Sequence, residues 1–368
     1  MELVLAPGRY CREENALAKA GAIAVSYGQA AVIIGGHRAL AVAGDALQAA
    51  LTGTGVKVTG LVHYGGECSL DNVDRLVKTE AVRQAAVLIG VGGGRALDTV
   101  KMAAYRLNRP LITVPTVAAT CAAWTMVAVV NDNAGAFVEV SSEAALPAAV
   151  IADTGILAAA PLDFLVAGIG DTLAKYYEAE ISVRCRSELL PNERFALQIA
   201  IKLAERLMDT VAVQAVAEAK RRQPSAAFDE VVDAIFMEAG IVSNCGGDAA
   251  RAAFAHSVYS ALTILPPVHN SRHGAVVAFG ILCQLMLDKV PEPEIRRYVE
   301  FSRQAGLPVT LAEIGLAVVS EAELRKVAEV TLGIPELRNM PYKVTADMVF
   351  AAVQAADTAG RREDKQYD

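Results

Sequence analysis

The chain has 368 residues, of which 54% are hydrophobic and 20% charged, and its net charge is −7. This length suggests about two domains, and so high an apolar fraction excludes a disordered chain. The charge is acidic and the basic residues are not gathered into a stripe, so we expect no nucleic-acid partner.

The first 160 residues alternate short apolar runs with helical patterns. Strands are predicted at 30–36, 57–66, 85–94 and 110–116, with helices between them at 37–55, 70–84 and 95–108. This alternation predicts a Rossmann-like parallel sheet with helices on both faces. Two later runs, 137–142 and 148–157, are predicted to add edge strands.

One part of this region, residues 111–130, has no charge and is as long as a membrane span of about 20 residues. Several threonines and Pro115 interrupt it. We therefore expect a buried strand followed by a polar-lined loop, and no membrane span.

After Pro161 strand signals nearly vanish. Helical patterns run through 171–186, 192–222, 225–243, 248–263, 274–289, 292–305, 320–331 and 345–358. We predict a nucleotide-binding α/β domain over 1–160 and an all-helical, metal-binding domain over 161–368, with the active site in the cleft between them.

Targeting and redox features point to the cytoplasm. The six cysteines are widely spaced and form no CxxC pair, which predicts reduced thiols in a cytoplasmic protein. The first residues, "MELVLAPGRYCREE", do not show the pattern of a signal peptide.

The stretch "IGVGGGRALDTVK" (89–101) is a glycine-rich turn from a strand to a helix that begins near Arg95. Such a turn lets backbone N–H groups approach a diphosphate at the helix N-terminus. It is not a GxGxxG fingerprint, because Arg95 takes the last position. A merely tight turn is the alternative.

Asp171 follows two glycines in "GIGDTLAKYYEAE" (168–180), and the residues alone favour an N-cap at the start of a helix. Three of the five histidines, His256, His269 and His273, fall within one short span around a Pro-Pro turn. One carboxylate and two imidazoles suit Zn²⁺ and leave a coordination position open. His269 is a possible alternative ligand that we assign to the loop.

The motifs together resemble those of the group III, iron-containing alcohol dehydrogenases, and in particular their glycerol-dehydrogenase branch, which shares the dehydroquinate synthase-like fold. The resemblance covers essentially the whole chain. It rests on "GGECS" (65–69), "GVGGGRALDTVK" (90–101), "PTVAAT" (115–120), "GIGDTLAKYYEA" (168–179), "AHSVYSALT" (255–263) and "HGAVVAFGIL" (273–282).

The resemblance implies that Asp171, His256 and His273 are the ligands of one divalent metal, and it changes the interpretation of Asp171 from N-cap to ligand. Longer-chain iron enzymes carry a histidine four residues after this aspartate, where this chain has Lys175. We therefore expect zinc rather than iron.

The resemblance also implies a nicotinamide cofactor. Relatives that use NAD often have an acidic residue where this chain has Gly36, followed by His37 and Arg38. Loss of that carboxylate removes repulsion against a 2′-phosphate, which Arg38 could bind, so NADP(H) is favoured over NAD(H). Asn131 falls where a tyrosine near the nicotinamide is common. The other residues expected at the cofactor are Gly92, Gly93, Gly94, Arg95, Asp98, Thr116, Thr120, Thr125 and Val127.

Cys121 stands where glycerol dehydrogenases have an aspartate that contacts the polyol. The sequence "TCAAWT" is instead similar to a branch of hydroxycarboxylate dehydrogenases. With Trp124 as a second candidate for the substrate pocket, this predicts hydride transfer to or from a small secondary alcohol or ketone, and a 2-oxo acid is a plausible substrate. A glycerol dehydrogenase is the alternative.

Other readings are weaker. A phosphate-substrate relative, such as glycerol-1-phosphate dehydrogenase or dehydroquinate synthase, needs a basic pocket, and only Arg251 and Arg272 are basic near the histidines. A non-catalytic, zinc-stabilised protein would not need the complete ligand set. The expected partners are a small-molecule substrate and further copies of this chain in a homo-oligomer.

Overall fold

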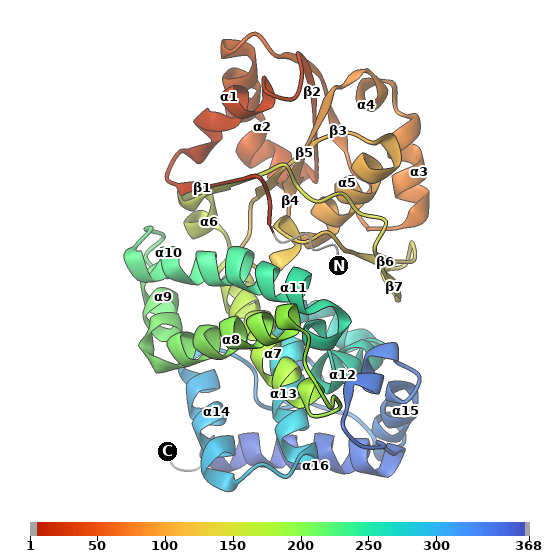
Figure 1. The fold of residues 1–368 in the computed structure, drawn as a ribbon. Helices are drawn as coiled ribbons and strands as arrows, with labels where there is room; N and C mark the ends of the chain where they lie inside the picture. Colours follow the sequence, from red (N-terminus) through yellow and green to blue (C-terminus); the bar gives the residue numbers. More distant parts are fainter. Residues whose placement is uncertain (1–5, 365–368) are drawn as a thin grey trace. The chain divides into compact units, whose positions relative to one another are not determined.

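The computed structural model describes residues 6–364, without the side chains of residues 248–251 and 363–364. Within it the chain packs into two compact units (Figure 1). Unit 1 comprises residues up to Pro161 and Glu218–Asn244, and unit 2 comprises Leu162–Ala217 and the residues from Cys245 onward. The sequence assigned the segment 218–244 to the second domain, whereas it packs with the first.

Unit 1 is built on a parallel six-stranded sheet. Its strand order is β1-β8-β5-β4-β2-β3. The four strands expected first are present and pair in parallel, with bounds β2 Ala30–Gly35, β3 Lys57–His63, β4 Val87–Gly92 and β5 Leu111–Pro115. The uncharged stretch 111–130 is thus β5, the short 3₁₀ helix η2 (Cys121–Ala123) and most of β6 (Ala128–Asn131).

The two predicted edge strands were placed wrongly. β8 (Ala149–Asp153) lies inside the sheet between β1 and β5, and every residue of it is buried. β7 (Phe137–Ser141) is not in this sheet, because it pairs antiparallel with β6. The sheet ends instead in β1 (Arg9–Glu13), whose sequence RYCRE is too polar to be recognised as a strand.

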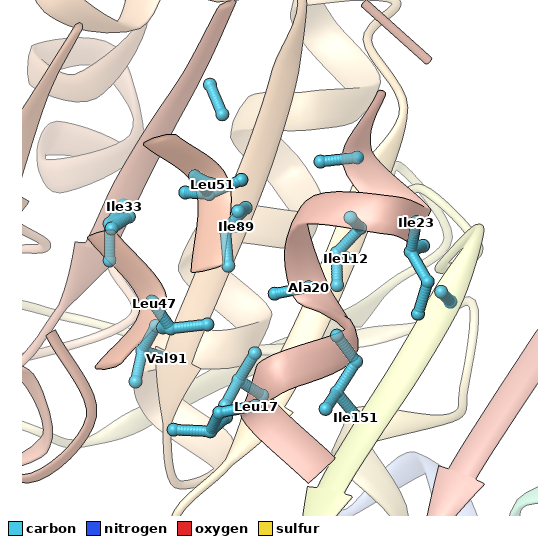
Figure 2. Close-up of a cluster of buried hydrophobic side chains, with 14 of the residues drawn as sticks. Leu17, Ala20, Ile23, Ile33, Leu47, Leu51, Ile89, Val91, Ile112 and Ile151 are labelled. Carbon is cyan, nitrogen blue, oxygen red and sulfur yellow. The ribbon is translucent and has the colours of Figure 1, made fainter. Parts of the chain in front are cut away.

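Helices cover both faces of the sheet because its strands are apolar on both sides. One core joins η1 (Ala16–Lys19), α1 (Ala20–Ala24) and α2 (His37–Gly53) to the sheet; Leu47 and Leu51 of α2 meet Ile33 and Ile89 there (Figure 2). The other core packs α3 (Leu70–Lys78), α4 (Glu80–Gln84) and α5 (Gly94–Leu107) against alternate strand residues such as Val32 and Leu88. A short helix, α6 (Thr154–Ala159), follows β8.

Ion pairs join the helical segment of unit 1, Glu218–Asn244, to the edge strand β1. It contains α10 (Ala226–Asp233), the π-helical turn η4 (Ala234–Glu238) and the start of α11 (Ala239–Arg251). The guanidinium group of Arg12 on β1 binds Asp229 at 2.6 Å and Asp233 at 2.8 Å, and the Tyr10 hydroxyl donates to Asp233.

Among its described residues, unit 2 consists of helices and the loops between them and has no strand, as the sequence predicts. Its helical elements are α7 (Leu162–Val183), α8 (Pro191–Arg206), the π-helical turn η3 (Leu207–Val211), the first part of α9 (Ala212–Ala219), the end of α11, α12 (Phe254–Leu262), η5 (Pro266–Asn270), α13 (His273–Leu287), α14 (Glu292–Ala305), η6 (Ala312–Ile314), α15 (Glu321–Thr331), η7 (Pro335–Asn339) and α16 (Ala346–Asp364). Helix α13 is buried along nearly its whole length and packs against α7, α12 and α16. Across residues 6–364, no helix combines the length and the apolar character needed to cross a bilayer.

Candidate functional site

Two glycines allow α7 and α13 of unit 2 to cross in close contact. A Cβ atom on Gly274 would lie 2.0 Å from the carbonyl oxygen of Ala167, and one on Gly170 would lie 2.4 Å from that of Gly274. Each glycine is the chain neighbour of a residue implicated above, Asp171 or His273. The close approach of the backbones therefore brings these two side chains together.

Helix α12 reaches the same place by a similar contact on α13. A Cβ atom on Gly280 would lie 2.4 Å from the carbonyl oxygen of Ala255, which directly precedes His256. Small residues at both helix crossings thus hold three helices close enough for Asp171, His256 and His273 to meet.

The three side chains form a group that could hold a metal ion. The Nε2 atoms of His256 and His273 each lie 3.3 Å from Oδ1 of Asp171, and one ligand atom from each residue falls within 4.8 Å of the others. Two ligands about 2.0–2.1 Å from a tetrahedral zinc are about 3.3 Å apart. The donor atoms and their spacing therefore fit a divalent metal of this kind.

Asp171 cannot be an N-cap, because it lies in the middle of α7 rather than at its start. The helix begins nine residues earlier, at Leu162, and runs straight through the two glycines. His269 is not in the group: it lies in η5, and its Nε2 atom contacts the carbonyl oxygen of Thr263 at 2.7 Å.

Glu178, two turns after Asp171 on α7, is completely buried beside His256. Its Oε2 atom accepts the Nδ1 proton of the imidazole ring. The ring is therefore held with Nε2 directed to Asp171, as in the carboxylate–histidine pairs that support metal sites.

The electrostatics of this group favour a cation. Burial alone would raise the pKa of Asp171, but Lys175 and the two histidines lower it well below its usual range. Burial lowers the pKa of His256, but Glu178 and Asp171 outweigh burial and raise it to about 9. Two buried carboxylates thus draw positive charge onto the site, either a proton or a metal ion.

In unit 1 the glycine-rich turn lies at the carboxyl end of β4, beside the end of β2. The chain adds β3 on one side of β2 and β4 on the other, which makes the space between β2 and β4 the topological switch point where ligands of such sheets bind. Helix α5 begins at Gly94, one residue before the predicted start, with Gly93 as its N-cap. Gly92 has φ +145°, which favours glycine.

The loop after β5 is held by a buried ion pair. Lys101 on α5 is fully buried; its ammonium group binds Asp98 at 2.7 Å and donates to the carbonyl oxygens of Thr125 and Val127. Asp98 also accepts the N–H of Val129. Asp98 and Thr125, both predicted at the cofactor, are thus buried and engaged in holding this loop.

Thr116 and Thr120 lie earlier in the same loop. Thr116 is half-buried, and its N–H donates to the carbonyl oxygen of Gly92 in the glycine-rich turn. Thr120 is the N-cap of η2, and its hydroxyl lies 3.3 Å from where a Cβ atom on Gly94 would be. Both threonines therefore lie beside the predicted diphosphate loop.

A second acid, Glu67, joins two predicted cofactor residues. Its carboxylate accepts a hydrogen bond from the Asn131 amide N–H₂ at 2.9 Å and forms an ion pair of 2.9 Å with Arg95.

The residues predicted to choose between NAD(H) and NADP(H) lie at the end of β2. Gly36 is the N-cap of α2, and the ring of His37 stacks on that of His63 at the end of β3 with centroids 4.1 Å apart. Arg38 follows and is exposed.

Cys121 and Trp124 are both buried within unit 1. The Cys121 sulfur is 3.8 Å from the hydroxyl oxygen of Ser243. Trp124 packs edge-on to Tyr10, and a Cβ atom on Gly240 would lie 2.4 Å from its ring. Trp124 therefore packs in the core of unit 1, between β1 and α11.

Comparisons with known proteins agree with this arrangement. A family model described as iron-containing alcohol dehydrogenase matches residues 7–154. A glycerol dehydrogenase of Thermotoga maritima is 38% identical over 81% of each chain, and hydroxycarboxylate dehydrogenase A of Escherichia coli is 36% identical over 89% of each. The chain belongs to the iron-containing alcohol dehydrogenase family.

Membership of the iron-containing alcohol dehydrogenase family makes the chain an oxidoreductase, as its sequence predicts. The crystal structure of a glycerol dehydrogenase from Schizosaccharomyces pombe superposes with a TM-score of 0.91 at 29% identity, covering all of this chain and 93% of that one. The predicted fold, a parallel α/β sheet domain with an all-helical domain, is confirmed.

Sequence analysis missed three charged residues that hold candidate site residues in place through hydrogen bonds and ion pairs. Glu178, Lys101 and Glu67 all lie within quoted motifs but received no role. For Glu178 the signal was its spacing, because seven residues after Asp171 is the same face of a helix. For Lys101 it was a charged pair at i, i+3 within an apolar helix.

Proposed function

We propose that this chain is a zinc-dependent, NAD(P)-linked dehydrogenase that transfers hydride between nicotinamide and a small secondary alcohol or ketone, with a 2-oxo or 2-hydroxy acid as the favoured substrate. The convergence of Asp171, His256 and His273 from three helices carries the proposal. Their donor atoms suit zinc, and Lys175 occupies the position of the extra histidine in the longer iron enzymes.

In this proposal, different residues bind the metal, bind the cofactor diphosphate and position the loop after β5. Asp171, His256 and His273 would hold the zinc, which supplies a Lewis acid for the substrate oxygen. The turn Gly92–Arg95 would take the cofactor diphosphate at the start of α5, and Thr116 and Thr120 lie beside that turn. Lys101 and Asp98 would fix the backbone of residues 125–129 along the cofactor.

The preference for NADP(H) rests on the end of β2. Gly36 offers no carboxylate to repel a 2′-phosphate, and the exposed Arg38 can bind one. The preference for a 2-oxo acid rests on Cys121, since neither its thiol nor the neighbouring Ser243 hydroxyl carries the negative charge that would repel a substrate carboxylate.

Glycerol is the second candidate substrate, because relatives at 31–38% identity are named glycerol dehydrogenases. A phosphate substrate is disfavoured: Arg272 is engaged by Asp163 and the ring of Phe164, and the Arg251 side chain lies outside the described residues.

We also propose that the active enzyme is a cytoplasmic homo-oligomer with its active site between the two domains.

The test is a panel of 2-oxo acids, ketones and polyols assayed with NADPH and NADH, with zinc added or withheld. We expect the highest kcat/KM for a 2-oxo acid with NADPH and dependence on zinc. Equal or higher kcat/KM for glycerol would reject the 2-oxo acid, and turnover independent of any metal would reject the metal site.

A further inference from the structure

Glu178 is a buried acid that the proposed reaction does not itself use. Its side chain is fully shielded from water, and it faces the first turn of α12, which lies 75 or more residues later in the chain. A buried carboxylate is costly unless several donors satisfy it, so the arrangement around it carries information about its role.

The first task of Glu178 is to cap α12. The N-cap of that helix is Ala253, which has no side chain to accept the free N–H groups. Oε1 of Glu178 accepts the N–H groups of Ala253 at 2.7 Å and of His256 at 2.9 Å. The N–H of Ala255 donates to Oε1 of Gln284 on α13. Two helices therefore supply the cap that the sequence of α12 lacks.

The second task involves the ring of His256. Oε2 of Glu178 accepts the Nδ1 proton, so Nε2 is the ring nitrogen that faces Asp171 and is placed to bind a metal. One carboxylate thus fixes both the backbone and the imidazole of the same residue. Because its partners are three N–H donors, a carboxylate satisfies all of them, whereas an amide would direct its own N–H₂ group at one.

We propose that Glu178 is a positioning residue whose negative charge sets the affinity of the Asp171–His256–His273 group for divalent metal. This proposal rests on the metal site proposed above. Asp171 and Glu178 are two buried acids that both contact His256, so replacing Glu178 by a neutral residue removes attraction for the cation as well as the hold on the ring.

The experiment measures metal affinity without catalysis. Full-length protein stripped of metal is titrated with Zn²⁺ in competition with a chromophoric chelator, for the wild type, Glu178→Gln and Gln284→Met. We expect Glu178→Gln to weaken zinc binding by about 10–100-fold. Gln284→Met is the matched control: it removes a cap from the same turn of α12 without touching His256, so its zinc affinity stays within about threefold of the wild type.

A second readout is the visible spectrum of the Co²⁺-loaded protein, which reports ligand geometry and is expected to change in Glu178→Gln but not in Gln284→Met. Circular dichroism verifies folding, and Glu178→Ala, which also removes the charge and the contact with the ring, replaces Glu178→Gln if that variant does not fold. Unchanged affinity in the folded variant, or equal losses in the Gln284→Met control, overturns the proposal. Failure of the wild type to bind Zn²⁺ would instead reject the metal site itself.

Discussion

Cys121 is the residue on which the proposed choice of substrate depends. Replacing it by aspartate places a carboxylate next to the Ser243 hydroxyl, which can donate to it. We expect Cys121→Asp to raise kcat/KM for glycerol relative to a 2-oxo acid by about tenfold or more, because the carboxylate accepts polyol hydroxyls and repels a substrate carboxylate. Steady-state assays with both substrates measure the ratio.

The matched control for this change is Cys121→Ser, which keeps the size and the neutral charge of the side chain. Its substrate ratio should remain within about threefold of the wild type. If the serine and aspartate variants shift the ratio equally, the charge at position 121 does not select the substrate.

The helix crossings of unit 2 depend on single glycines. Gly274→Ala would bring a methyl group to 2.0 Å from the carbonyl oxygen of Ala167, a backbone atom that cannot move away alone. We expect a loss of about 1–3 kcal/mol or more in stability and a weaker metal site, because α7 and α13 must separate. Thermal unfolding followed by circular dichroism and Zn²⁺ titration measure both effects.

Gly333→Ala is the control for this crossing, because its nearest neighbour, the carbonyl oxygen of Val330, would be 3.5 Å from the new methyl group. It should unfold within about 0.5 kcal/mol of the wild type. Wild-type stability and zinc affinity in Gly274→Ala would mean that the close crossing does not hold the ligands together.

Helix α5 contains the buried pair that supports the loop after β5. Lys101→Met leaves Asp98 buried without its partner, and we expect it to destabilise unit 1 by about 3–5 kcal/mol. The only tryptophan, Trp124, is buried in unit 1, so its fluorescence during denaturant unfolding reports on this unit.

The double variant Asp98→Asn/Lys101→Met should recover part of that loss, because no unpaired charge remains. Lys202→Met, which breaks an exposed pair with Glu205, serves as the surface control and should change stability by less than about 0.5 kcal/mol. A Lys101→Met variant as stable as this control would contradict the role of the pair.

Which elements could be predicted follows from how local their signals are. Strands such as β2 and β4 are apolar runs next to glycine turns and are visible in the sequence. β1 is polar because it lies at the edge of the sheet, and its pairing with β8 depends on residues about 140 positions away. Asp171 looked like a helix start because glycine usually interrupts helices, whereas Gly170 is required by the contact with α13, which no local pattern reveals.

At the scale of the molecule, the pattern change near residue 160 correctly indicates where helices replace the sheet. It could not assign the segment 218–244, because an amphipathic helix shows that one face is buried but not which partner covers it. The partner is visible only in three dimensions, through pairs such as Arg12 with Asp229 and Asp233. Asp171, His256 and His273 could be named as a group from the sequence because they lie in motifs that resemble those of the family, and the structure places their ligand atoms within 4.8 Å of one another.

Removing the metal tests whether the group serves catalysis or structure. The three candidate ligands project from α7, α12 and α13, which are joined by extensive apolar packing around the buried length of α13. We therefore expect a chelator to abolish turnover while circular dichroism and Trp124 fluorescence stay close to those of the loaded protein. Binding of a metal at 1,000 times its Kd adds only about 4 kcal/mol, so the stripped protein should unfold at a lower temperature but remain folded at 25 °C.

Zinc returned to the stripped protein should restore turnover, whereas His256→Ala should stay inactive at the same zinc concentration. Mg²⁺ is the control ion, since it prefers oxygen ligands in octahedral geometry and should not restore activity. Collapse of the circular dichroism signal on chelation would identify a structural metal. Full turnover in His256→Ala would show that His256 is not a ligand of the catalytic metal, because alanine has no atom that can bind zinc.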